Sequence, residues 1–229
     1  MPHSYQKVVS RIKALPKQYH LLELGNIKIN SSKFLFYVIT VPSLSPQAPN
    51  ILLCAGIHGD EPAGIEALLF FLEHSIGQYR RSFSFTIFPC LNPSGYDAGT
   101  RENNRGIDLN RNFLSKNIEL ETRLVRDFMK KKNQKYLFAW EMHEDNHRES
   151  ESGYTLRDNL RVFYIYTVSP KNDVAREVIR TLKINKISVT KRRMVYGESC
   201  SNGIILNNNT SVSSLRKGTF DEEMRKYTS

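Results

Sequence analysis

Hydrophobic residues follow two different periods along this chain, and each change of period marks a predicted element. Residues 51–56 (ILLCAG) form an unbroken apolar run that ends in glycine, which is typical of a buried strand in a parallel sheet. Residues 63–74 (AGIEALLFFLEH) carry apolar side chains at helical spacing, and Pro62 stands where the first turn of a helix tolerates proline. Residues 83–90 (FSFTIFPC) are a second apolar run, rich in β-formers. Together these segments predict a βαβ unit.

The same two periods predict elements in the rest of the chain. The polar stretch 91–113 and the tail from Val195 are rich in Asn, Gly, Ser or Arg, and we expect irregular structure in both. The overall order predicts an α/β fold with three layers, α/β/α, around a mixed, mostly parallel twisted sheet. The further segments are helical by period in residues 4–15, 118–134 and 173–185, and strand-like in residues 21–30, 33–42, 136–145 and 161–168.

Length and composition fit a single domain. The chain has 229 residues, of which 40% are hydrophobic and 24% charged, as in ordinary globular domains. Nowhere do about eighteen apolar residues follow one another, and the N-terminus has no long apolar stretch. Neither a membrane-spanning helix nor a secretory signal is therefore expected. Cys54, Cys90 and Cys200 fit no disulfide framework and no CxxC zinc site, which favours a reducing compartment and a cytoplasmic protein.

The net charge of +10 would allow contact with nucleic acid or with a membrane surface. Basic residues cluster at 80–81, 130–132 and 191–193, but no nucleic-acid motif accompanies them. We therefore predict solvated helix ends and loops, with no nucleic-acid or membrane partner. Salt-sensitive DNA binding would test the opposite interpretation. A basic surface could also steer anionic substrates.

Candidate metal ligands follow two of the predicted strands. His58 and Glu61 lie in HGDE, between the first apolar run and its helix, and His143 ends the run YLFAWEMH. In open α/β sheets, bound ions and small molecules lie in the crevice outside the carboxyl ends of the strands. Two histidines and a glutamate are a ligand set of catalytic zinc (Zn2+) that leaves a fourth position for water. His147 and Glu144 compete for the place of the third ligand, and His143 is preferred because it lies nearest the strand end.

The polar stretch that ends in GIDLNRNF adds charged candidates. Asp108 could accept a hydrogen bond from a ligating imidazole and so orient it. Arg101, Arg105 and Arg111 lie within eleven residues of one another. Guanidinium groups beside a metal suit an anionic ligand such as a carboxylate, and Asn110 could add a donor.

Three motifs, GIHGDE, NPSGYDAGTRENNRGIDLNRNF and EMHED, resemble the zinc carboxypeptidases, the M14 metallopeptidase family, in their order and spacing. The match covers roughly residues 51–143, with a weaker echo at KGTFDEEM. The resemblance implies the zinc-carboxypeptidase fold over residues 1–229. It also implies that His58, Glu61 and His143 bind zinc.

The resemblance further implies roles for the polar stretch. Arg101 would polarise the scissile carbonyl and stabilise the oxyanion. Asn110 and Arg111 would hold the terminal carboxylate of the substrate, and Asp108 would support His58.

The chain departs from the family pattern near its end. The family carries its general-base glutamate on a strand that follows the segment resembled by KGTFDEEM, and this sequence stops at Ser229 before such a strand. We therefore expect that the domain lacks its C-terminal strand and helix, with Glu222 or Glu223 as the alternative base. NNNTSVSS offers no match for the substrate-capping tyrosine of the family. Phe220 falls near a position that shapes the side-chain pocket there, and its apolar character does not favour basic substrate ends.

These observations predict a zinc-dependent metallocarboxypeptidase-like hydrolase that cleaves a peptide or amide bond next to a free C-terminal carboxylate. The first alternative is a zinc deacylase similar to succinylglutamate desuccinylase or aspartoacylase, acting on an N-acyl amino acid. The second is a catalytically inactive module that binds zinc and a carboxylate. Retained binding without turnover would identify the module.

Overall fold

The computed structural model describes residues 3–145, 162–167, 173–195, 198–206 and 218–228. The chain divides into two compact units. Unit 1 consists of Met1–Glu144 and Lys217–Ser229, and unit 2 of Asp145–Arg216. The expectation of a single catalytic domain over residues 1–229 stays a prediction.

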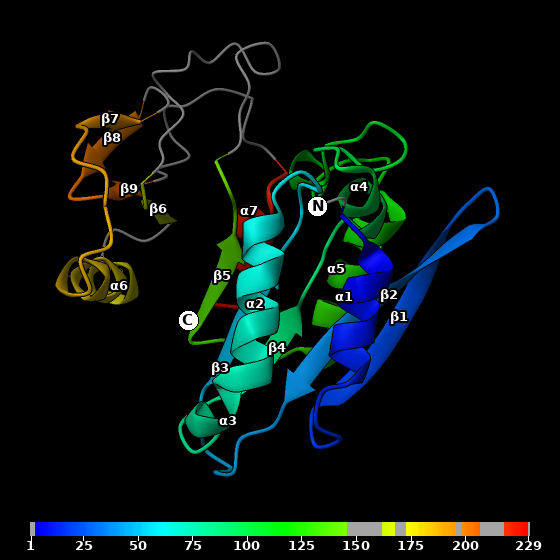
Figure 1. Cartoon of the computed structure of the whole chain (residues 1–229), viewed down its shortest axis with the longest axis horizontal. Coiled ribbons are helices and arrows are strands. Elements are labelled where there is room, and N and C mark those ends of the chain that lie inside the picture. Colours follow the sequence, from blue (N-terminus) through cyan, green and yellow to red (C-terminus); the bar gives the residue numbers. More distant parts are fainter. Residues whose placement is uncertain (1–2, 146–161, 168–172, 196–197, 207–217, 229) are drawn as a thin grey trace. The chain divides into compact units, whose positions relative to one another are not determined.

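Unit 1 contains a five-stranded mixed sheet with the strand order β1-β2-β4-β3-β5 (Figure 1). β3 pairs in parallel with β4 and with β5, whereas β2 runs antiparallel to both of its neighbours. The predicted α/β class, mixed sheet and βαβ unit are confirmed, and β4 rather than β3 occupies the central position. The strands are β1 (His20–Ile29), β2 (Ser32–Val41), β3 (Asn50–Ala55), β4 (Ser84–Phe88) and β5 (Phe138–Met142).

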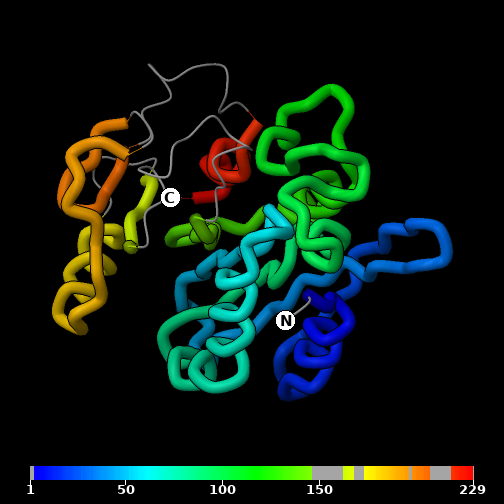
Figure 2. Tube along the Cα trace, turned by 45° about the horizontal axis from the view of Figure 1, so that its top comes forward, coloured from blue at the N-terminus to red at the C-terminus, as the bar shows by residue number. Residues whose placement is uncertain are grey.

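Helices lie on both faces of this sheet, which gives the three layers that the sequence predicts. Figures 1 and 2 show α1 and α2 side by side on one face, and α5 lies on the other. The helices of unit 1 are α1 (Tyr5–Lys13), α2 (Pro62–His74), α3 (Ile76–Tyr79), α4 (Pro93–Ala98), α5 (Leu120–Lys132) and α7 (Phe220–Met224), with a 3-10 turn η1 at Leu109–Arg111.

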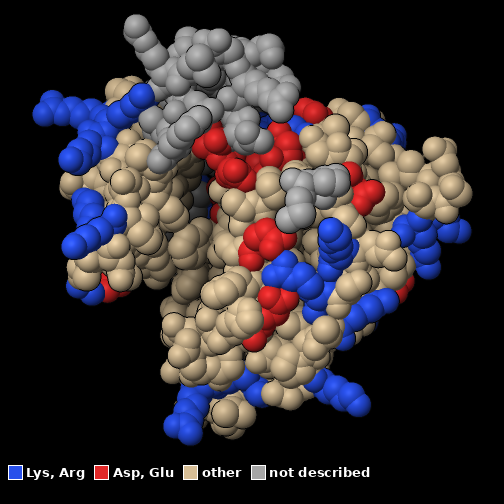
Figure 3. Space-filling view, in the orientation of Figure 1, with Lys and Arg blue, Asp and Glu red and all other residues tan. Residues whose placement is uncertain are grey.

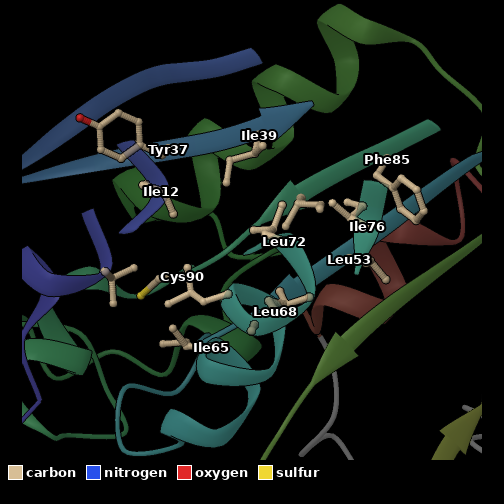
Figure 4. Packing of buried hydrophobic residues seen from close by; sticks show 14 of the residues in the cluster. Ile12, Tyr37, Ile39, Leu53, Ile65, Leu68, Leu72, Ile76, Phe85 and Cys90 are labelled. Carbon is tan, nitrogen blue, oxygen red and sulfur yellow. The ribbon is translucent and has the colours of Figure 1, made fainter. Parts of the chain in front are cut away.

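Buried apolar side chains form the core between the sheet and α2. Ile65 and Leu68 of α2 are fully buried against Ile39 of β2 and Leu53 of β3 (Figure 4). Ile12 of α1 joins the same cluster. Because an apolar helix face is buried here, the N-terminus of α2 is held close to the end of β3.

The opposite face of the sheet packs on α5 and α7. Leu52 points to this side, next in sequence to Leu53 on the other, because successive strand residues alternate between faces. Val125 of α5 and Phe220 and Met224 of α7 fill the cluster and are 1–2% exposed. Both faces of β3 are therefore covered, which accounts for its unbroken apolar run.

Unit 2 has a second sheet, with the strand order β6-β9-β8-β7. Three of its strands lie wholly or partly in the tail from Val195 that the sequence predicts to be irregular, so this prediction is wrong for residues 195, 198–201 and 204–206. Strands of two to four residues are too short to show a period, although Val195, Cys200 and Ile205 are buried together. The elements are β6 (Ile165–Thr167), α6 (Asp173–Ile184), β7 (Met194–Val195), β8 (Glu198–Ser201) and β9 (Ile204–Leu206).

The polar stretch 91–113 is also more regular than expected, since it contains α4 and η1. Pro93 stands in the first turn of α4, and the Asn92 side chain accepts a hydrogen bond from the backbone N–H of Gly95 at 2.9 Å. Gly99 ends the helix with a φ of 67°. Proline, a capping asparagine and a terminal glycine thus define a helix too short to show apolar periodicity.

Two features of the described residues concern membranes and surface charge. None of the described helices has the length and apolar character required to cross a membrane. On the face in Figure 3, Lys and Arg side chains form separate groups interrupted by other residues. Arg11 of α1, for example, pairs with Glu66 and Glu73 of α2 at 2.6 and 2.7 Å.

Candidate metal centre

Three potential metal ligands meet at the carboxyl ends of two neighbouring parallel strands. His58 follows β3, Glu61 precedes α2, and His143 comes directly after β5. The register of the two strands pairs Ala55 with Met142, which brings their ends level. One ligating atom from each of the three side chains lies within 4.8 Å of the other two. The structure thus brings together the set predicted from the sequence.

Both imidazoles turn the same nitrogen toward Glu61. The Nδ1 atom of His58 lies 2.7 Å from one Glu61 carboxylate oxygen, and Nδ1 of His143 lies 2.7 Å from the other. The Nε2 atoms face different carboxylates, Asp108 at 3.3 Å for His58 and Glu141 at 3.1 Å for His143. A carboxylate behind each ligating histidine is the usual outer arrangement of protein metal sites. This donor set fits a divalent metal bound through the two Nδ1 atoms and Glu61.

Burial and charge act in opposite directions on these groups. Burial alone would raise the pKa of Glu61, but the imidazoles of His143 and His58 hold it well below its usual range. Burial would lower the pKa of His143, yet the carboxylates of Glu61 and Glu141 raise it well above the ordinary histidine value. Burial would also raise the pKa of Asp108, and contacts with His58 and Arg101 lower it instead. The lowered pKa values of Glu61 and Asp108 keep these two carboxylates charged.

Two glycines shape the turn that carries His58. Gly56 has a φ of 66°, and its carbonyl accepts a 2.8 Å hydrogen bond from the backbone N–H of Asn92. A Cβ atom on Gly59 would lie 2.0 Å from the carbonyl carbon of Gly95 and 2.2 Å from the backbone nitrogen of Tyr96. The turn is therefore tight, and its backbone closely approaches that of α4.

Arg101 lies against the ligand set. Its Nη1 atom is 3.2 Å from Nδ1 of His58 and 3.6 Å from a Glu61 oxygen, and its Nη2 donates to Asp108 at 3.0 Å. By contrast, Arg105 is largely exposed and pairs with Glu119 at 3.4 Å. Of these two arginines, Arg101 alone contacts the candidate ligands.

Asn110 and Arg111 differ in their surroundings. Asn110 is 8% exposed, and its Oδ1 accepts the backbone N–H of Phe220 at 2.9 Å while its Nδ2 lies 3.4 Å from Nε2 of His143. Arg111 is exposed, and its Nη1 donates to the carbonyl of Asn110 at 2.7 Å. Asn110 thus joins α7 to a candidate ligand, and Arg111 presents charge at the surface beside it.

The alternative third ligands have other partners or lie outside the described residues. The Glu144 side chain accepts the backbone N–H of Ala63 at 3.0 Å, and its own backbone N–H donates to Glu61 at 3.1 Å. Glu144 thus contacts the set through its backbone, while its carboxylate faces the first turn of α2. His147 lies outside the described residues.

The acids considered as general bases contact other groups. Glu222 accepts the backbone N–H of Gly218 at 2.9 Å. Glu223 is fully buried, 3.6 Å from Arg126 and 2.6 Å from Lys226. Within the described part of the chain, no contact joins either carboxylate to a candidate ligand.

Two further expectations concern the substrate pocket. The structure buries Phe220 at 1% exposure, with its ring centroid 5.6 Å from that of Phe113, so it is a core residue here. NNNTSVSS, where the sequence offers no tyrosine, lies outside the described residues.

Glu141 is a polar neighbour that the sequence analysis missed. It lies two residues before His143, so the two side chains project from the same side of β5 and its extension. The sequence signal for this contact was an acid two residues before a histidine at the end of a strand.

Part of this chain is similar in sequence to known hydrolases. The profile of the succinylglutamate desuccinylase/aspartoacylase catalytic domain matches residues 47–152. Human carboxypeptidase D is 27% identical over 146 residues, which cover 54% of this chain and 11% of that protein. Murein peptide amidase A of Escherichia coli K12 is 35% identical over 80 residues, or 35% of this chain and 32% of the amidase. The chain therefore spans at most about a third of the length of these two relatives.

Solved structures show the same fold. A candidate metallopeptidase of Shewanella amazonensis SB2B superposes with a TM-score of 0.71 at 20% identity, covering 97% of this chain and 79% of that one. A metallo-carboxypeptidase of Burkholderia cenocepacia gives a TM-score of 0.58 at 18% identity over 80% of this chain and 50% of that one. The predicted fold class and the resemblance to the zinc carboxypeptidases are confirmed.

Proposed function

Because the chain has a zinc-carboxypeptidase-like fold and resembles carboxypeptidases in sequence, we propose that it is a zinc-dependent hydrolase. Its substrate would carry a peptide or amide bond next to a free C-terminal carboxylate. The observation that carries this proposal is the convergence of His58, Glu61 and His143, with the Arg101 guanidinium 3.6 Å from Glu61. Zinc bound there would act as a Lewis acid toward the scissile carbonyl and a water molecule.

The protein groups around this set have separate tasks in the proposed reaction. Water adds across the C–N bond, giving a carboxylic acid and an amine. Arg101 offsets the negative charge that develops on the carbonyl oxygen. Arg111, exposed beside Asn110, binds the substrate carboxylate before and during the reaction. Asp108 fixes the ring of His58 so that its Nδ1 faces the metal.

The resemblance implies a glutamate as general base, and Glu222 and Glu223 are the acids that the sequence analysis offers for this role. Both carboxylates already have other partners, Gly218 for Glu222 and Arg126 with Lys226 for Glu223, which argues against either acid as the base. Glu222→Gln and Glu223→Gln should therefore leave turnover in an active preparation within about threefold of wild type. A loss of about a hundredfold or more in either variant would identify that residue as the base.

Metal analysis and paired substrates test the proposal. We expect about one zinc per chain, bound much more weakly in His58→Ala, Glu61→Ala and His143→Ala. Peptides with a free C-terminus should be cleaved, and the same peptides with an amidated C-terminus should be cleaved poorly. Absence of zinc binding in the wild-type protein would refute the proposal, as would equal cleavage of both peptide forms.

The succinylglutamate desuccinylase/aspartoacylase profile supports a second candidate, a zinc deacylase acting on an N-acyl amino acid. Such an enzyme would discriminate among acyl groups. A series of N-acyl amino acids with different acyl chains, compared with peptides of matched C-terminal residue, separates the two activities. Zinc and carboxylate binding with no turnover of either series would instead identify a binding module.

A further inference from the structure

Glu141 is a buried acid whose environment calls for an explanation. Its side chain is 3% exposed, although it lies at the edge strand β5. Its Oε2 atom lies 3.1 Å from Nε2 of His143, and its Oε1 atom is buried with no hydrogen-bond partner among the described residues. A buried carboxylate with one open oxygen is costly, and such groups in native proteins usually have a functional cause.

An ion pair with lysine or arginine does not account for the burial of the Glu141 carboxylate. Among the described residues, its recorded ion-pair partner is His143, and no lysine or arginine lies within bonding distance. The nearby core group is the Cys54 thiol, whose pKa is raised by burial and also by the negative charge of Glu141. Glu223, the other deeply buried acid of this region, has two cationic partners. Glu141 has an imidazole instead.

We propose that Glu141 is a positioning residue for the metal ligand His143. Its carboxylate accepts the N–H of Nε2, which fixes the imidazole in the tautomer with an unprotonated Nδ1. That nitrogen is the one facing Glu61, where the proposed metal binds. Glu141 is thus the counterpart of Asp108 at His58, and each ligating histidine has its own carboxylate. This inference rests on the metal site of the proposed function.

The charges around the site favour a carboxylate at this position over a neutral amide. Glu61, Asp108 and Glu141 contribute three negative charges when ionised. A divalent metal and the Arg101 guanidinium contribute three positive charges, so the loaded site is neutral. Arg101 contacts Asp108 and Glu61 beside His58. At His143, the neutral amide of Asn110 lies 3.4 Å from Nε2, and no arginine or lysine pairs with this histidine among the described residues. Glu141 therefore supplies the negative charge that strengthens His143 as a donor.

Zinc affinity of Glu141→Gln tests this role directly. The glutamine is close in size, but it can present an N–H toward Nε2 and carries no charge. We expect zinc to bind about 10- to 100-fold more weakly, as is usual when the outer partner of a metal ligand is changed. The affinity is measured on metal-free protein by competition with a chromogenic chelator. Glu121→Gln is the matched control, because Glu121 is also 3% exposed but contacts Asn103 rather than a candidate ligand.

Three readouts separate positioning from a general structural effect. Metal-free Glu141→Gln should keep the wild-type circular dichroism spectrum and unfold cooperatively, because glutamine has nearly the same volume as glutamate and a general loss of structure would change both readouts. The absorption bands of bound Co2+ should shift in Glu141→Gln and stay unchanged in Glu121→Gln. In a His143→Ala background, Glu141→Gln should cost no further zinc affinity, because its effect passes through the histidine.

Several outcomes would overturn the inference. Zinc affinity of Glu141→Gln within about threefold of wild type would show that the carboxylate does not act on the metal site. An equal loss of affinity with and without His143 would show that it acts by another route. If Glu141→Gln does not fold, nitrogen NMR of the wild-type zinc form decides. The inference expects a proton on Nε2 of His143 and fails if Nε2 is metallated. Wild-type protein without zinc binding would overturn the proposed function together with this inference.

Discussion

Substituting Gly59 by alanine should damage the metal centre through a purely steric effect. The new methyl group would lie 2.0 Å from the carbonyl carbon of Gly95, whereas ordinary contact begins near 3.4 Å. The turn and α4 would have to separate by about 1.4 Å, the difference between these two distances. Two backbone hydrogen bonds oppose this movement, from Asn92 N–H to Gly56 at 2.8 Å and from Gly59 N–H to Arg101 at 3.3 Å.

The expected cost follows from the type of contact. Overpacking a close-packed site costs about 1–3 kcal/mol and occasionally more. Here three backbone atoms lie within 2.4 Å of the methyl position, and none belongs to a flexible side chain. We therefore expect a loss of about 3 kcal/mol, which lowers the melting temperature by roughly 6–12 °C in a domain of this size. Zinc affinity should fall as well, because the two ligands His58 and Glu61 flank the displaced residue.

Gly99 provides the matched control on α4. It has a φ of 67°, and a Cβ atom there would meet nothing within 4 Å. Gly99→Ala should therefore cost only the left-handed backbone penalty, about 1–2 kcal/mol, and leave zinc affinity unchanged. Both variants are compared by thermal unfolding without metal and by zinc competition. If Gly59→Ala melts within about 2 °C of wild type and binds zinc equally well, the turn is not held against α4 and the reasoning is wrong.

Four further predictions concern charged side chains. Arg101→Ala should lower kcat by about 10²–10³, the effect of removing an oxyanion donor, and an unchanged kcat would remove Arg101 from that role. Arg111→Ala should mainly raise KM in steady-state assays, because in the proposed function Arg111 binds a carboxylate that is present in both ground and transition states; a fall in kcat alone would contradict this. Burial raises the pKa of Glu121. Its protonated form is therefore favoured by folding, stability is greatest below the unfolded pKa and falls as pH rises, and Glu121→Gln should melt higher than wild type at pH 7 but not at pH 4. Arg11→Ala should cost no more than about 1 kcal/mol in urea unfolding and less at high salt, because its pairs with Glu66 and Glu73 are at the surface.

The meeting of the candidate ligands could be predicted because it depends on strand direction. Parallel strands present their carboxyl ends at one edge, so residues following 51–56 and 136–142 could be placed at the same edge of the sheet once both runs were identified. The long apolar run and the helical spacing after Pro62 were sufficient for this. The place of β5 beside β3 was not predictable, because pairing between distant strands leaves no trace in either segment.

Other features depend on contacts that one sequence does not reveal. α4 supports the turn that carries His58, because Gly59 packs on the backbone of Gly95. This contact is visible only once the two segments are adjacent. The spacing of Glu141 two residues before His143 was a signal in the sequence, but the contact between their side chains is identified only in the folded chain. The strands of unit 2 have two to four residues, too few for an alternation of apolar and polar residues to be recognised within a polar tail.

The division of unit 1 into two separate stretches of chain affects its biogenesis. Residues 1–144 leave the ribosome first, but Phe220 and Met224 of α7 occupy the core beneath the sheet at 1% and 2% exposure. Another 80 residues must be synthesised between Glu144 and Met224, which takes about 4–16 s at ordinary rates of translation. During this interval the nascent chain exposes the apolar surface that α7 later covers. Chaperones and proteases would therefore act on this protein mainly before α7 emerges.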